Sequence, residues 1–156
     1  MSAFRSALAA LALFALPAQA HDGIHVENAY ARASAQSGAV FMTIMNFGAD
    51  EDRLLSATTD AAERAELHTH TEDANGVMQM LEVSEGLAIP GNDKRELARG
   101  GDHLMLMGLT RDLKNGDMIT LTLTFEHEGQ VIVEVPVDND RKTPDDADHK
   151  MHSHTP

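Results

Sequence analysis

The chain has 156 residues and a formal net charge of −13 at pH 7, with 25 acidic residues against 12 Lys and Arg. This balance argues against nucleic-acid binding, which needs a basic surface. The sequence contains no cysteine, and this excludes disulfides, thiolate ligands and dithiol redox chemistry. A soft-metal site would therefore have to use the nine His and nine Met residues.

The N-terminal segment MSAFRSALAALALFALPAQA predicts a secretory signal peptide over residues 1–20. It has a positive charge at Arg5, an apolar run over residues 7–16, and small residues at Ala18 and Ala20. The apolar run is too short to span a membrane, and no later stretch is longer. We therefore expect an exported protein that starts at His21 and has no stable membrane insertion.

From Ile24 to Val137 the sequence alternates short β-rich runs with Gly, Asn, Asp and Pro turn signals. The predicted strands are 24–31, 39–46, 53–58, 65–71, 77–83, 86–89, 94–97, 103–107, 118–127 and 130–137. Residues 60–66 and 110–114 are candidates for single helical turns. Many short strands with regular turn spacing predict an all-β sandwich or barrel.

The composition divides the exported chain into one domain and a tail. Residues 118–125 alternate apolar and threonine side chains, and four valines alternate from Val131 to Val137, which predicts a half-buried C-terminal hairpin. The following residues, DNDRKTPDDADHKMHSHTP, have no apolar period. We expect a β-sandwich domain over residues 21–138 and a solvated, His/Met-rich acidic tail over residues 139–156.

Strand alternation separates two kinds of side chain in the segment GDHLMLMGL. Leu104 and Leu106 share one face of a strand, while His103, Met105 and Met107 share the other. The leucines are the natural core residues, so the imidazole and thioethers are expected on the outer face.

The same alternation applies to RAELHTH and GVMQMLEV. Leu67 is expected to point inward, with His68 and His70 outward, and Met78 and Met80 share one face of the next strand. Paired thioethers and imidazoles on neighbouring strands thus predict one cluster on the outer face.

A four-ligand cluster of His68, Met80, His103 and Met105 would favour copper. Thioether sulfur is soft and uncharged, so it selects Cu(I) over Zn(II), Ca(II) or Mg(II). Without a thiolate, a carrier of Cu(I) is favoured over a blue-copper electron-transfer protein. The alternative is that these Met residues fill gaps in a core, with the histidines as ordinary surface residues.

Three segments carry a resemblance to a known family. Residues 65–68, 76–80 and 100–109 resemble the His, Met and His-x-Met motifs of the PCuAC periplasmic copper chaperones, and the resemblance extends over nearly the whole mature domain. Both gaps between the motifs are one residue longer here than in the family pattern. Loops at residues 72–76 and 91–93 are the expected places for the extra residues, because an insertion within a strand would reverse its faces.

Either Met80 or its same-face neighbour Met78 is then the ligand, and we predict Met80. Met107 is expected to form a hydrophobic lid or a partner contact.

The resemblance implies a cupredoxin-like Greek-key β-sandwich in the periplasm that is not an enzyme. It implies that Cu(I), bound by His68, Met80, His103 and Met105, is delivered to the copper-bearing subunit of cytochrome c oxidase, with a Sco-type protein as a further candidate partner. The alternative function is periplasmic copper storage or detoxification without a dedicated client.

Two segments outside the sandwich could hold additional copper. The tail carries His149, Met151, His152 and His154 beside three aspartates, which indicates either a second site for Cu(II) or an ordinary charged tail. Cleavage after Ala20 would expose the amino group and imidazole of His21, a pair that can chelate Cu(II).

Overall fold

The computed structural model describes residues 23–142, and within them every regular element is a β-strand. The strands are β1 (Ile24–Ala33), β2 (Ser37–Asn46), β3 (Asp52–Thr59), β4 (Ala62–Glu72), β5 (Met78–Glu82), β6 (Leu87–Ile89), β7 (Asp93–Leu97), β8 (His103–Leu109), β9 (Met118–Phe125) and β10 (Gln130–Pro136). All ten predicted strands are present, so the all-β fold class is confirmed. None of the described residues forms a helix that is long and apolar enough to cross a membrane.

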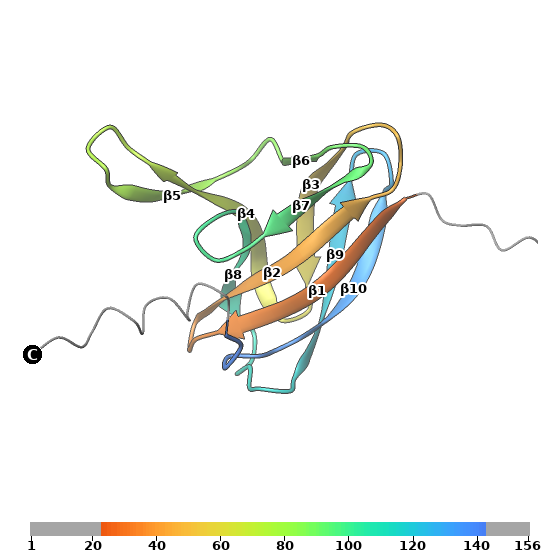
Figure 1. The fold of residues 1–156 in the computed structure, drawn as a ribbon. Helices are drawn as coiled ribbons and strands as arrows, with labels where there is room; N and C mark the ends of the chain where they lie inside the picture. Colours follow the sequence, from red (N-terminus) through yellow and green to blue (C-terminus); the bar gives the residue numbers. More distant parts are fainter. Residues whose placement is uncertain (1–22, 143–156) are drawn as a thin grey trace, which may run out of the picture.

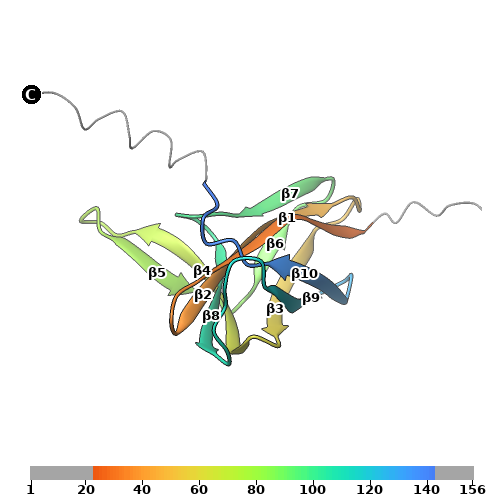
Figure 2. The same cartoon turned by 90° about the horizontal axis from the view of Figure 1, so that it is seen from below.

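The strands form a strongly curved antiparallel sheet that nearly closes on itself (Figure 1, Figure 2). The order along the sheet is β1, β2, β8, β4, β3, β9, β10, while β5, β6 and β7 pair with β4, β3 and β2. The two ends of this path meet at a parallel bridge between Ala31 and Val137. The N–H of Asp138 also donates to the carbonyl oxygen of Ala31 at 2.8 Å.

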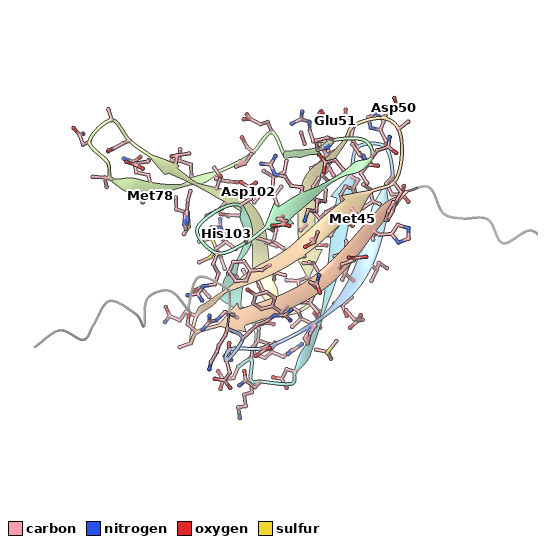
Figure 3. The ribbon with its side chains drawn as sticks, in the orientation of Figure 1. Met45, Asp50, Glu51, Met78, Asp102 and His103 are labelled. Carbon is pink, nitrogen blue, oxygen red and sulfur yellow. The ribbon has the colours of Figure 1, made fainter. Side chains whose placement is uncertain are left out.

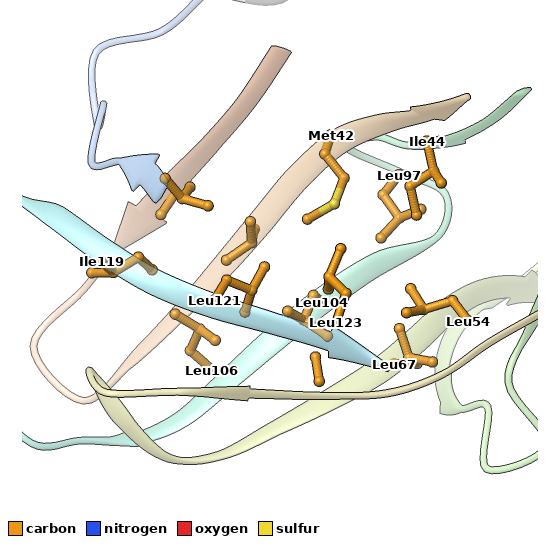
Figure 4. Packing of buried hydrophobic residues seen from close by; sticks show 14 of the residues in the cluster. Met42, Ile44, Leu54, Leu67, Leu97, Leu104, Leu106, Ile119, Leu121 and Leu123 are labelled. Atoms are coloured by element: carbon orange, nitrogen blue, oxygen red, sulfur yellow. The ribbon is translucent and has the colours of Figure 1, made fainter. Parts of the chain in front are cut away.

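The core lies between the two walls of the curved sheet (Figure 4). The inward-facing residues of β9, namely Ile119, Leu121, Leu123 and Phe125, are buried as their alternation predicts. Leu104 and Leu106 of β8 are fully buried, and Leu67 of β4 packs with them. Because these leucines occupy the inner face of β4 and β8, only the outer face of the two strands is available for functional side chains.

The two predicted helical turns are wrong. Residues 60 and 61 form a bend, β4 begins at Ala62, and residues 110–114 are irregular. The segment DAAERAE has strong helix formers, but Ala61 and Ala62 are buried and Ala65 pairs with Leu106 of β8. Tertiary pairing thus overrides local propensity here.

The core makes a prediction about stability. Leu104→Ala should lower the free energy of unfolding by roughly 3 kcal/mol, because it removes apolar burial and leaves a cavity in a closed sheet. Ile132→Ala, at a side chain that is 69% exposed on β10, should change it by less than about 0.5 kcal/mol. Urea denaturation of both variants measures the difference, and similar losses would contradict the assigned core.

Candidate metal centre

Three adjacent strands, β5, β4 and β8, bring the predicted ligands to one outer face. His68 on β4 lies directly opposite His103 on β8, and His70 lies opposite Met80 on β5. Residues paired across an antiparallel ladder share a face. The three imidazoles and the Met80 thioether therefore lie on the side of the sheet opposite Leu67 and Leu104. Met105 follows His103 at the next outward position of β8. The structure therefore gathers all four predicted ligands onto one surface of three strands.

The imidazole rings are close neighbours. The ring centroids of His68 and His103 are 5.8 Å apart, and those of His70 and His103 are 5.2 Å apart. His70 was not among the predicted ligands, although its alternation with His68 placed it on the same face. Its proximity to His103 was not predictable, because it depends on the register of β4 against β8, which pairs His68 with His103.

His103 is the most enclosed of these residues, with 4% of its surface exposed. Phe41 of β2 lies 6.3 Å from it, centroid to centroid, and the two other imidazoles cover it from β4. The Nδ1 atom of His103 lies 3.0 Å from the carbonyl oxygen of Gly101. A carbonyl can only accept, so Nδ1 carries the proton and the lone pair of Nε2 is left for a metal. The site is thus less open at His103 than the outer-face prediction implied.

His68 is oriented by a carboxylate. Its Nε2 lies 3.2 Å from Oε2 of Glu66, and Oε1 of Glu66 in turn pairs with the Arg64 guanidinium at 3.0 Å. This contact places the His68 proton on Nε2. The other nitrogen, Nδ1, is buried and has no hydrogen-bond partner in the described part of the chain. A buried lone pair without a donor is what a metal ligand leaves when the metal is absent, so the residues fit a metal ion.

The loop before β8 is held by an ion pair. Arg95 of β7 donates from Nε to Oδ2 of Asp102 at 2.7 Å. Asp102 directly precedes His103, and Figure 3 labels both beside the loop that leads into β8. This contact and the Gly101 hydrogen bond restrict how far the His103 ring can turn.

The two methionines of β5 differ in their distance from the imidazoles along the ladder. Met80 is opposite His70, whereas Met78 is opposite Glu72, one pair further out. Figure 3 shows Met78 on the projecting hairpin. Register therefore places Met80 nearer to the imidazoles than Met78, and both side chains are exposed. The choice of Met80 as the ligand stays a prediction.

A site on this face requires thioether ligands. Within residues 23–142, no group of three or more His, Asp or Glu side chains is arranged to hold a metal ion. Two imidazoles with two thioethers form a soft, uncharged donor set, which is suited to Cu(I) rather than to hard divalent cations. The other predicted metal-binding residues, His21, His149, Met151, His152 and His154, lie outside the described residues.

A family model, described as putative lipoprotein LpqE-like, matches residues 24–137. The chain belongs to the LpqE-like family. A curated relative, putative lipoprotein Lxx21020 of Leifsonia xyli, is 38% identical over 123 residues, covering 78% of this chain and 73% of the relative. This LpqE-like match spans all ten strands.

Solved structures similar to this LpqE-like chain are PCuAC domains. The apo PCuAC domain of PmoF1 is 25% identical with a TM-score of 0.64, covering 74% of this chain and 92% of that domain. The solution structure of Cu(I)-bound DR1885 from Deinococcus radiodurans is 31% identical with a TM-score of 0.59, covering 75% of this chain and 80% of that one. The predicted resemblance to the PCuAC family and its cupredoxin-like sandwich are confirmed.

The burial of His103 leads to a prediction about its protonation in the metal-free protein. Desolvation lowers the pKa of His103 below its ordinary value of 6.5, and the nearby His70 and His68 act in the same direction, while the Gly101 and Asp102 contacts oppose them. NMR titration of the ring resonances should show His103 remaining neutral below pH 6.5. Since the unfolded chain binds this proton more readily, the native state should lose stability as the pH falls below about 6.5. A midpoint at or above 6.5 would contradict the buried environment.

Proposed function

We propose that this protein is a periplasmic copper chaperone that binds Cu(I) through His68, Met80, His103 and Met105. The observation that carries the proposal is the pairing of His68 with His103 across β4 and β8, with thioethers on both sides of the pair. The Cu(I)-bound form of DR1885, at 31% identity, supports copper as the metal. A predicted signal peptide and membership of a family described as lipoproteins support export.

The proposed client is the copper-bearing subunit of cytochrome c oxidase, and a Sco-type protein is a second candidate partner. Both follow from the PCuAC resemblance. The arrangement of ligands suits delivery, because His68, His103 and Met105 belong to the closed sheet while Met80 is 48% exposed on β5. An incoming ligand can replace the Met80 thioether first, and Cu(I) then moves without a change in oxidation state. No bond of the protein fold has to break.

Copper binding can be tested by competition with a colorimetric Cu(I) chelator. The wild-type domain should hold one Cu(I), and His103→Ala or Met105→Leu should weaken its affinity by at least about tenfold, or about 1.4 kcal/mol. X-ray absorption of the loaded protein should detect both nitrogen and sulfur neighbours. Unchanged affinity in both variants would reject the site.

The choice between the two β5 methionines gives a sharper test. Met80→Leu should reduce Cu(I) affinity, whereas Met78→Leu should leave it within about twofold of wild type, since register places Met78 beside Glu72 rather than His70. Both substitutions conserve volume and lie at exposed positions, so neither should alter the melting temperature. The reverse ranking would assign Met78 as the ligand.

Copper storage without a client is the alternative, and the tail residues distinguish it. A protein truncated after Lys142 should still restore oxidase activity to cells that lack the full-length protein if it is a chaperone. A storage protein would instead lose copper tolerance on truncation. The proposed second site for Cu(II) in the tail, and the His21 chelate, are measured in the same series by Cu(II) binding to full-length and truncated protein.

A further inference from the structure

The outer parts of β4 and β5 form a two-stranded arm that leaves the body of the sheet. We define the arm as residues 69–82. β4 pairs with β8 as far as His68, and from Thr69 to Glu72 its pairing is with β5. Every residue of β5 is exposed. Figures 1 and 2 both show this hairpin projecting beyond the other strands.

The arm keeps its shape through its turn rather than through a core. Oδ1 of Asp73 accepts from the N–H groups of Asn75 and Val77 at 2.8 and 3.0 Å, and Oδ2 accepts from the Gln79 amide at 3.1 Å. Gly76 adopts a positive φ of 79° that a residue with a side chain rarely takes. An isolated two-stranded hairpin is marginal in water, so these contacts hold a segment that buries little of its own apolar surface.

Both faces of the arm carry exposed apolar side chains. Met78 and Met80, on the metal-centre face, are 58% and 48% exposed, while Val77 and Leu81, on the opposite face, are 55% and 48% exposed. Single exposed apolar residues are ordinary, but four within five positions give each face of the hairpin an exposed apolar pair, and side chains of this kind are found at the centres of interfaces.

The charged side chains near these four apolar residues are all acidic. Residues 69–86 contain Glu72, Asp73, Glu82 and Glu85 and neither Lys nor Arg. A surface with an apolar centre and an acidic border is complementary to an apolar groove bordered by basic residues. Such complementarity also accelerates encounter at low ionic strength.

We propose that the arm inserts into an apolar groove bordered by Lys and Arg on the copper-accepting protein. The inference rests on the proposed chaperone function and names the surface through which the acceptor is recognised. Because Met80 belongs to the arm, a groove that holds the arm also covers the most exposed of the proposed copper ligands. Docking and ligand exchange are thereby coupled at one element, with Cu(I) kept in the same oxidation state throughout.

The test measures the second-order rate of Cu(I) transfer to the soluble, reduced apo domain of the oxidase subunit. The double substitution Val77→Ser and Leu81→Ser removes the apolar face that points away from the metal centre. It should slow transfer at least tenfold while Cu(I) affinity and melting temperature stay at wild-type values. Ile132→Ser is the control, since it removes from β10 an apolar side chain that is 69% exposed, more than Val77 or Leu81, and should transfer at the wild-type rate.

A second variant tests the acidic border without touching apolar residues. Glu72→Gln with Glu85→Gln should slow transfer several-fold at low salt and flatten its dependence on ionic strength. Glu27→Gln with Asp112→Asn is the matched control, because it removes two exposed charges from other parts of the fold. This control pair should retain the wild-type salt dependence.

The outcomes separate the two proposals. Wild-type rates in both arm variants would overturn the arm as the docking element and leave the chaperone function standing. A lack of transfer from the wild-type protein that nonetheless binds Cu(I) would overturn both the client and the arm proposal. Slower transfer in the arm variants, but not in the controls, supports the arm.

Discussion

The pairing of β4 with β8 is the constraint on which the candidate metal centre depends. Leu67 faces Leu104 and His68 faces His103 in consecutive pairs of the same ladder. Burial of the leucines fixes this register, because a slip by one residue would expose them and turn the imidazoles into the core. The alternation of side chains along β4 and β8 therefore places the leucines in the core and the imidazoles on the outer face. Burial of the core residues thus also positions the candidate ligands.

Different neighbours orient the imidazoles of His68 and His103. The carbonyl of Gly101 places the His103 proton on Nδ1, and the carboxylate of Glu66 places the His68 proton on Nε2. Each ring thus presents one lone pair, on Nε2 of His103 and on Nδ1 of His68. Groups that contact a ligand without binding the metal commonly fix its tautomer in this way. The two imidazoles of the candidate centre are accordingly oriented by the protein itself.

The sequence predicted all ten strands and the common face of His68, Met80, His103 and Met105, because alternation and turn residues are local signals. It did not predict that His103 is buried or that His70 lies beside it, since both depend on long-range neighbours, namely Phe41 of β2 and the register of β4 against β8. The helical turn expected at residues 60–66 failed for the same reason: the pairing partner of Ala65 lies on another strand. Likewise, Val77 to Leu81 reads as an ordinary apolar strand, and only the topology makes it an arm exposed on both faces.

The proposed ligands differ in exposure, and this difference favours copper transfer over copper storage. A protein that only retains copper gains by enclosing every ligand, since buried ligands exchange slowly. Here His103 is 4% exposed, whereas Met80 is 48% exposed and belongs to an element that protrudes from the sheet. The Met80 thioether is the most exposed of the four proposed ligands, so it is the one that an approaching protein meets first. Enclosed imidazoles would hold Cu(I) against loss to solvent, and an accessible thioether would let a competing ligand begin the exchange. The acidic border of the arm would select which protein comes near enough to do so.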